Sequence, residues 1–306
     1  MHTMPIDKPD FILYAQHGWA DTGKAIASLA NRLATPKTLV VSPSLGFINT
    51  WLRIEPLIAA VEKIAIETNS RYPNTPIRII GHSMGGLIWL EVLNRHPEWW
   101  SRVESLVLIA SPIGGADLAR LLDPLSLGVG IARDLGKNRR EIAEAIAKAI
   151  PTLIIAGDFD NGSDGTIPIG STKFRNAQFV LLPGLSHAIM RHHSDVTTVI
   201  QDFWTSEKTL SDISEPELTD LLIQRLQLVS GITDAHHRDF SKAQVCFTLE
   251  NGISICTWKN LLGIDHVFVS CPEGKCLYSG FVGWLHSENL QQTLQEIERE
   301  FTENIS

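Results

Sequence analysis

The chain has 306 residues, of which 44% are hydrophobic and 20% are charged, and its formal net charge at pH 7 is -8. This length and composition are typical of a globular protein with one large domain, or one large and one small domain, and exclude a disordered chain. The acidic balance argues against nucleic-acid binding and against attraction to an anionic membrane. No run reaches the roughly 18 apolar residues of a membrane-spanning helix, so we expect none.

The N-terminal sequence lacks the basic and apolar regions of a secretory signal. The four cysteines, Cys246, Cys256, Cys271 and Cys276, are too few and too unevenly spaced for a disulfide framework. Both features favour a cytoplasmic location. The four-residue gap between Cys271 and Cys276 does not match the paired spacing of structural zinc sites, so we favour buried thiols or a cross-linked hairpin over a metal.

Six short apolar runs, rich in Val, Ile and Leu, alternate with helical patterns in the first 204 residues. Such runs are typical of strands buried on both faces of a parallel sheet. The predicted strands are residues 11–16, 38–42, 77–81, 104–110, 152–157 and 177–182. The predicted helices are residues 22–34, 52–69, 84–95 and 192–204. This alternation predicts an α/β fold with a doubly wound, mostly parallel sheet over residues 1–206.

The connection between the fourth and fifth predicted strands, residues 111–150, is much longer than the others. It contains several Gly and Pro residues and two helical patches. Long insertions in compact domains are usually functional, so we interpret residues 112–150 as a short helical lid. The alternative is a surface decoration.

A polar stretch at residues 205–217 indicates a linker, with a boundary near residue 206. Beyond it the sequence predicts a helix at 216–230, a hairpin around Glu250-Asn251-Gly252, and a second hairpin formed by 265–270 and 276–281. A final amphipathic helix is predicted at 287–301. Residues 207–306 are therefore expected to form a small α+β domain of unknown role.

The strongest chemical signal is Gly81-His82-Ser83-Met84-Gly85, followed by Gly86. It joins an apolar strand to a helix, which is the setting of a nucleophile elbow. The serine of such a turn has a strained backbone, and glycines two positions before and after it avoid collisions. The helix that follows points its first amides at a developing oxyanion. We therefore predict Ser83 as a nucleophile; the alternative is a glycine-rich turn with an incidental serine.

From about residue 10 to 204 the chain resembles the α/β-hydrolases, in particular lipases and esterases. His17-Gly18-Trp19 is similar to their His-Gly oxyanion segment, and residues 81–86 are similar to their nucleophile elbow. Ala110-Ser111-Pro112 with Gly114-Gly115 is similar to the start of their lid region. The resemblance implies a serine hydrolase with the α/β-hydrolase fold that needs no metal or organic cofactor. The C-terminal hundred residues have no counterpart in it.

The resemblance also implies an oxyanion hole made of two backbone amides. One belongs to Met84, directly after the nucleophile. The other belongs to the loop after the first strand, where Trp19 has the favoured position. His17 either takes part in catalysis or braces this loop, and we favour the bracing role.

A serine hydroxyl needs a histidine to accept its proton. In the α/β-hydrolases this histidine follows the last strand of the sheet, and His187 comes directly after the run at 177–182. His192 and His193 are the alternatives, but their side chains would be committed to the surface of the terminal helix. We therefore predict His187 as the general base.

The acid that orients this histidine should follow the penultimate strand, where Asp158, Asp160, Asn161 and Asp164 lie close together. Residues 164–168 resemble the Asp-x-x-hydrophobic-Pro segment in which many α/β-hydrolases place the acid, so we favour Asp164. Asp160 is the second choice. The alternative for each is loop capping, because aspartate accepts hydrogen bonds from its own backbone in turns.

The resemblance thus implies hydrolysis of a carboxylic ester by Ser83, His187 and Asp164, whose order along the chain matches that of the family. A thioesterase or acyltransferase on the same triad is one alternative. Another is a non-catalytic binding module whose C-terminal domain recruits a protein partner. The expected ligand is a small acyl ester, and an apolar lid would favour a lipid. The apolar residues of the insertion are Leu118, Leu121, Leu122, Leu125, Leu127, Val129 and Ile131, which would otherwise pack onto the sheet.

Overall fold

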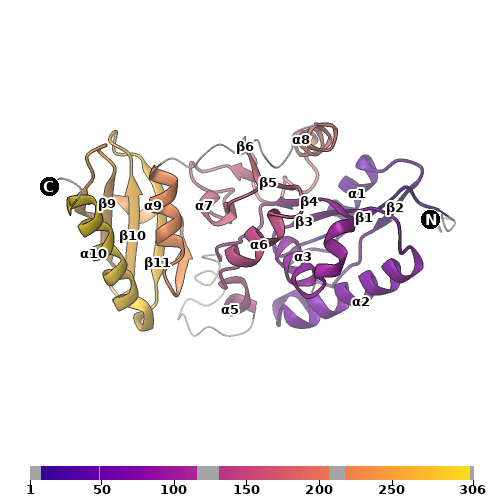
Figure 1. The fold of residues 1–306 in the computed structure, drawn as a ribbon, viewed down its shortest axis with the longest axis horizontal. Helices are drawn as coiled ribbons and strands as arrows, with labels where there is room; N and C mark the ends of the chain where they lie inside the picture. The colour runs from indigo at the N-terminus through magenta and orange to yellow at the C-terminus, as the bar shows by residue number, and fades with distance from the viewer. Residues whose placement is uncertain (1–7, 48, 116–130, 207–217, 304–306) are drawn as a thin grey trace.

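The computed structural model describes residues 8–47, 49–115, 131–206 and 218–303. These residues contain two sheets that lie in different parts of an elongated molecule (Figure 1). The N-terminal sheet has six strands in the order β2-β1-β3-β4-β5-β6, and the C-terminal sheet has five in the order β7-β11-β10-β9-β8.

All neighbouring strands of the N-terminal sheet are parallel. The strands are β1 (Phe11–Gln16), β2 (Thr38–Val41), β3 (Ile77–His82), β4 (Val103–Ile109), β5 (Thr152–Asp158) and β6 (Gln178–Pro183). The longer helices between and after them are α1 (Lys24–Leu33), α2 (Glu55–Arg71), α3 (Met84–Arg95) and α8 (Ser194–Thr205). The short elements are η1 (Asn49–Trp51), η2 (Pro97–Arg102), α5 (Ile131–Leu135), α6 (Arg140–Ala147) and α7 (Ile169–Thr172). The predicted α/β fold is therefore confirmed.

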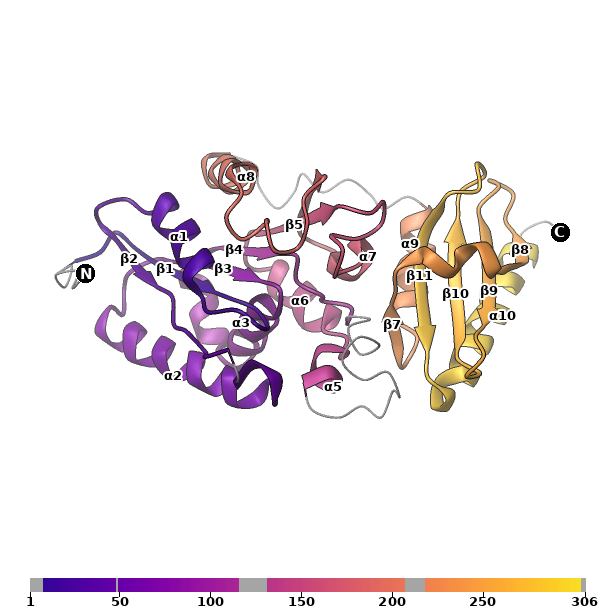
Figure 2. The ribbon, with the colours of Figure 1, turned by 180° about the vertical axis from the view of Figure 1, so that it is seen from behind.

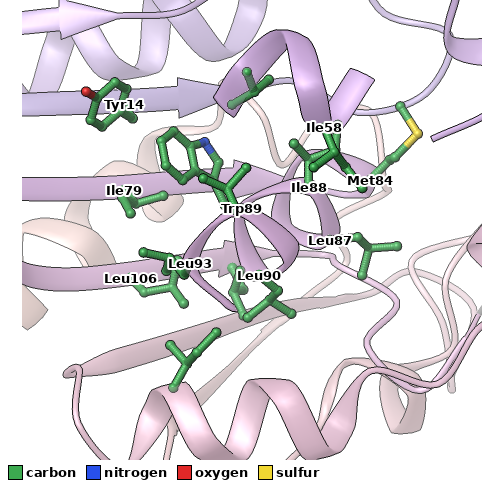
Figure 3. Close-up of a cluster of buried hydrophobic side chains, with 14 of the residues drawn as sticks. Tyr14, Ile58, Ile79, Met84, Leu87, Ile88, Trp89, Leu90, Leu93 and Leu106 are labelled. Carbon is green, nitrogen blue, oxygen red and sulfur yellow. The ribbon is translucent and has the colours of Figure 1, made fainter. Parts of the chain in front are cut away.

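Two apolar clusters cover the two faces of this sheet, because successive strand residues point to opposite faces. Tyr14 and Ile79 pack with α2 and α3, whereas Leu13 and Ile80 pack with α1 and α8. Figure 3 shows the first cluster, in which the ring centres of Tyr14 and Trp89 lie 4.7 Å apart. Nine of the twelve residues of α3 are buried, so this helix is fixed firmly beneath the turn that precedes it.

The connection between β4 and β5 contains α5 and α6. Asp134 of α5 accepts hydrogen bonds from Arg53 Nε at 2.8 Å and from the Ile54 amide at 2.9 Å, just before α2. Ile131 and Leu135 are buried in the same core as α3, so these two residues pack the insertion onto the sheet. The other apolar residues of the predicted lid lie outside the described residues: Leu118, Leu121, Leu122, Leu125, Leu127 and Val129.

The C-terminal sheet is antiparallel and has a core of its own. Its strands are β7 (Ile232–Asp234), β8 (Gln244–Thr248), β9 (Ser254–Lys259), β10 (Asp265–Ser270) and β11 (Cys276–Val282). Residues of α9 (Leu218–Gln227) and α10 (Ser287–Glu303) contribute to that core. The remaining elements are η4 (His237–Lys242) and η5 (Trp284–His286). Both predicted hairpins are present, formed by β8–β9 and β10–β11.

A buried ion pair joins the insertion between β4 and β5 to the C-terminal sheet. Arg140 of α6 donates from Nη2 to Asp234 Oδ2 of β7, and the hydroxyl of Tyr278 donates to Asp234 Oδ1 at 2.8 Å. All three side chains are buried. Gly114, just after β4, has no room for a side chain, because a Cβ there would overlap both members of the pair. The insertion and the C-terminal sheet are thus held together by charge.

Candidate active site

Ser83 occupies the sharp turn between β3 and α3. Its backbone has φ 54° and ψ -127°, a strained conformation for a residue with a side chain. A Cβ on Gly81 would overlap Gly86, and one on Gly85 would overlap the carbonyl of Gln16. The two glycines of the motif are therefore required by backbone packing. They allow a turn that presents Ser83 at the carboxyl edge of the parallel sheet.

His187 and Asp164 come from the loops after β6 and β5. The imidazole of His187 donates from Nδ1 to Asp164 Oδ2 at 2.6 Å, and the His187 amide donates to the Asp164 carbonyl at 2.9 Å. The other carboxylate oxygen, Oδ1, accepts from the amides of Thr166 at 3.0 Å and Ile167 at 2.7 Å. Three contacts therefore fix the buried carboxylate toward this histidine, and a fourth joins the two backbones.

The other acids of the same loop have partners other than His187, and Asp160 Oδ1 also lies 3.4 Å from His236 Nε2. Asp160 Oδ1 accepts from the amide of Ser163 at 2.9 Å and from its hydroxyl at 2.8 Å. Asp158 Oδ1 accepts from the Gly162 amide at 2.8 Å. These are the capping contacts expected of aspartate in turns. Only Asp164, among the four acceptor candidates of this described loop, contacts His187.

The alternative histidines have other positions. His193 precedes α8 and caps it, since its Nδ1 accepts from the amide of Asp195 at 3.3 Å. His192 is exposed on the surface. The structure thus brings His187, and neither alternative, into contact with a carboxylate after β5.

His82, which the sequence analysis did not single out, links the elbow to the predicted base. Its Nε2 donates to the carbonyl of His187 at 3.1 Å, and the two rings lie 4.7 Å apart. Burial holds the pKa of His82 well below its usual range, so the ring is neutral. The nucleophile motif accepts any residue between Gly81 and Ser83, so the sequence alone does not indicate a role for His82.

The loop after β1 packs directly against the nucleophile. A Cβ on Gly18 would lie only 2.7 Å from the Cβ of Ser83 and 3.2 Å from its Oγ. Met84 is the first residue of α3, so its amide has no acceptor within the helix. Within the described part of the chain, no acceptor is recorded for the Trp19 amide either. Both amides expected in the oxyanion hole are thus free to bind an anion.

His17 is buried beneath this loop and bridges two segments. Its Nε2 accepts from the Leu45 amide at 2.9 Å, so Nδ1 must hold the ring proton, which it donates to the Gly18 carbonyl at 2.9 Å. Burial lowers the pKa of His17, which favours this neutral form. These contacts are those of a bracing residue.

Aromatic side chains border the same loop. The rings of Trp19 and Trp51 are 4.3 Å apart, and those of Trp51 and Phe47 are 6.3 Å apart. Phe47 and Trp51 are about half and two-fifths exposed. These rings therefore form an apolar cluster beside the loop after β1.

One cavity lies away from the proposed nucleophile and base. A cavity of about 620 Å³ is lined by residues of β6, α7, α9 and β11, and it includes Asp158 and Gly162 but neither Ser83 nor His187. Among the described residues, no group of three or more His, Cys, Asp or Glu side chains could hold a metal ion. All four cysteines are free thiols, so the hairpin cross-link is not formed. No described helix is long and apolar enough to cross a membrane.

A comparison with family models gives one match, within the first half of the chain. Residues 7–128, which include Ser83 and the loop at 17–19, match a family model described as serine aminopeptidase, S33. No curated protein sequence matches the chain.

Several solved structures resemble about two-thirds of the chain at low identity. Est1E from Butyrivibrio proteoclasticus, solved with ferulic acid, is 17% identical over 65% of this chain and 89% of its own, with a TM-score of 0.49. The lipase BlEst2 from Bacillus licheniformis is 14% identical over 66% and 94%, with a TM-score of 0.47. The esterase EaEST from Exiguobacterium antarcticum is 13% identical over 65% and 93%, with a TM-score of 0.46.

Fold and sequence thus point the same way. The parallel sheet is flanked by helices, and a serine with a strained backbone follows β3. That serine lies within the segment that matches the family model. The chain therefore has an α/β-hydrolase fold around its parallel sheet, and its residues 7–128 match the serine aminopeptidase, S33, family model.

Proposed function

We propose that the protein is a serine hydrolase that cleaves carboxylic esters through an acyl-enzyme on Ser83. One observation supports this most strongly. The hydrogen-bonded pair of His187 and Asp164 lies beside the elbow, since the ring of His187 is 4.7 Å from that of His82, the residue before the strained serine. Nucleophile, base and acid therefore come from three neighbouring loops at one edge of the sheet.

In the first half-reaction, Ser83 Oγ forms a bond to the acyl carbon while His187 Nε2 takes the hydroxyl proton. The tetrahedral intermediate then collapses, and the bond from carbon to the alcohol oxygen breaks. The alcohol leaves with the proton that His187 held. The carboxylate of Asp164 keeps Nδ1 protonated, so that Nε2 faces the serine and the imidazolium is stabilised.

In the second half-reaction, His187 removes a proton from water as the water oxygen attacks the acyl carbon. Collapse of this intermediate releases the acid and returns the proton to Ser83. The amides of Met84 and Trp19 stabilise the oxyanion of both intermediates. His17 supports the Trp19 side of the hole by fixing the backbone at Gly18.

The aromatic side chains beside Trp19 favour an apolar acyl or aryl group in the substrate. Phe47 and Trp51 offer ring faces on the approach to Ser83. The free thiols are typical of a reducing compartment, and we place the activity in the cytoplasm. We also propose that the chain divides near residue 206 into a hydrolase domain and a C-terminal α+β domain.

Labelling with a fluorophosphonate probe tests the nucleophile on the full-length protein. Wild type should label, Ser83→Ala should not label at all, and His187→Ala should label far more slowly. Ser111→Ala is the matched control, because Ser111 is also a buried serine and follows β4 of the same sheet after one intervening residue. A folded wild type that fails to label would favour the non-catalytic binding module instead.

A panel of p-nitrophenyl esters and acyl thioesters of increasing chain length tests the bond that is cleaved. An esterase should turn over the esters more rapidly than thioesters of the same acyl group. Faster turnover of the thioesters would favour a thioesterase on the same triad. Release of acyl product only when an acceptor alcohol is added would favour an acyltransferase.

A further inference from the structure

The loops after β1 and β6 are joined by an ion pair. Arg191 Nη1 lies 2.8 Å from Asp21 Oδ2, and the two side chains are 26% and 9% exposed. Asp21 comes two residues after Trp19, whose amide is expected in the oxyanion hole. Arg191 comes four residues after His187, the proposed base. The ion pair therefore connects the two loops that carry these groups.

The sheet itself does not join these loops directly. Within it, β1 and β6 are separated by β3, β4 and β5. The helices that follow the two loops, α1 and α8, lie on the same face of the sheet (Figure 2), and their apolar residues share one core. Arg32 of α1 also donates to the carbonyl of His192 at 2.8 Å. Contacts of side chains, rather than strand pairing, thus fix the spacing of the two loops.

Each member of the ion pair is also bound to its own loop. Asp21 Oδ1 accepts a hydrogen bond from the Thr22 amide at 2.6 Å. Arg191 Nε donates to the carbonyl of Ala188 at 3.0 Å, and Ala188 is the residue directly after His187. Both side chains are therefore fixed to the backbone as well as to each other, so each loop resists a movement of the other.

The loop beside Trp19 needs such support because its backbone is strained. Ala20 has φ 52°, in the left-handed region that residues with a side chain rarely adopt. A conformation of this kind persists only where the surrounding contacts fix it. The Ala20 amide donates to Thr50 Oγ1 at 3.1 Å, and Thr50 is fully buried. Thr50 thus fixes Ala20 itself, and the ion pair fixes the residue that follows it.

We propose that Asp21 and Arg191 are a positioning pair that sets the distance between the Trp19 amide and the base His187. This role rests on the proposed function. The oxyanion forms only as the acyl carbon is attacked, so a displaced amide weakens binding of the transition state and leaves binding of the ester unchanged. Both half-reactions use the same oxyanion hole. Loss of the pair should therefore lower kcat and kcat/KM by the same factor.

Steady-state kinetics on the preferred ester test this role in the full-length protein. Asp21→Asn and Arg191→Gln should each lower kcat and kcat/KM about tenfold, which is less than the roughly 10²–10³-fold loss when an oxyanion donor is removed outright. The double variant should lose no more than the worse single variant, because the two side chains act as one unit. The rate of fluorophosphonate labelling should fall by a similar factor, since that reaction also places an oxygen in the hole.

Two further variants separate positioning from general stability. Arg191→Lys keeps a cation beside Asp21 but loses the bond to the Ala188 carbonyl, so it should recover only part of the rate. Arg95→Gln is the matched control, because Arg95 is 33% exposed and pairs with the mostly buried Glu62 at 3.1 Å. Arg95 lies at the opposite end of α3 from Met84, so its rates should stay within about twofold of wild type. All assays are run well below the melting temperatures of the variants.

The possible outcomes are distinct. Single variants that lose melting temperature but keep wild-type kcat would make the pair a stabilising contact and overturn the proposal. It is also overturned by a change confined to KM, by losses that multiply to about a hundredfold in the double variant, or by an equal loss in Arg95→Gln. A wild type that does not label with the fluorophosphonate overturns the proposed function and this role together. A wild type that labels, with variants that label equally fast, overturns this role alone.

Discussion

The imidazole of His82 donates a hydrogen bond from Nε2 to the backbone carbonyl of His187, across 3.1 Å. This contact connects the turn after β3 to the loop after β6, two segments that are 105 residues apart in the sequence. It holds the backbone of the proposed base, while Asp164 holds the side chain. Because the ring is neutral, its single proton must lie on Nε2 for this contact to form.

His82 is therefore expected to act as a positioning residue. His82→Ala should lower kcat roughly five- to tenfold with little change in KM, because the lost hydrogen bond loosens His187 without touching the substrate. His82→Gln should restore much of the loss, since its amide can donate to the same carbonyl. Steady-state kinetics on the preferred ester measure both. Equal losses in the two variants, or a change confined to KM, would contradict the assigned role.

Asp164→Asn should reduce kcat by about 10⁴-fold, because an amide cannot keep the His187 proton on Nδ1. Asp160→Asn is the matched control, since that side chain caps the same loop through Ser163. Its kcat should remain within a few-fold of wild type. A large loss in the Asp160 variant with a small one in the Asp164 variant would exchange the two roles.

The buried histidines should make stability depend on pH. Burial lowers the pKa of both His17 and His82 in the folded protein, whereas in the unfolded chain each titrates near its ordinary value. As the pH falls below about 6.5, the unfolded state binds protons that the folded state does not bind, so the free energy of unfolding decreases. Each histidine contributes a slope of up to about 1.4 kcal/mol per pH unit in that window.

Urea unfolding of the wild type and of His82→Gln at pH 7.5 and pH 5.5 measures this dependence. The wild type should lose more stability on acidification than the variant. An equal loss in both proteins would show that folding does not lower the pKa of His82.

The ion pair of Arg140 and Asp234 should be sensitive to the loss of one partner. Arg140→Met leaves a buried carboxylate without its cation, and we expect the free energy of unfolding to fall by about 3–5 kcal/mol. Adding Asp234→Asn should recover part of this, because the amide is neutral and still accepts from Tyr278. Arg175→Met is the control: Arg175 pairs with Glu144 but is 52% exposed, so its loss should cost at most about 1 kcal/mol. Denaturant titration of the four proteins distinguishes these values, and equal costs for the two arginines would refute the assignment.

Much of this architecture could be predicted from the sequence because its strongest signals are local. The apolar runs predict all six parallel strands, and the spacing of Gly81 and Gly85 predicts the strained turn at Ser83. The hairpin at residues 250–252 followed from its Asn-Gly pair. Strand β7 was missed, because three residues are too few to show a period.

Other features could not be read from the chain because they depend on contacts between distant segments. The bond from His82 to His187 and the pair of Arg140 and Asp234 involve residues about a hundred positions apart. The choice between Asp164 and Asp160 depended on family resemblance in the sequence, whereas in the structure it follows from which carboxylate meets Nδ1 of His187.

The pair formed by Arg140 and Asp234 also makes the part of the chain before residue 206 depend on the part that follows it. A chain that ended at residue 206 would retain every residue of the proposed triad, yet it would leave the Arg140 guanidinium without its carboxylate. Removal of residues 207–306 therefore takes away the partner of a charged side chain in the N-terminal part of the chain as well as a separate sheet.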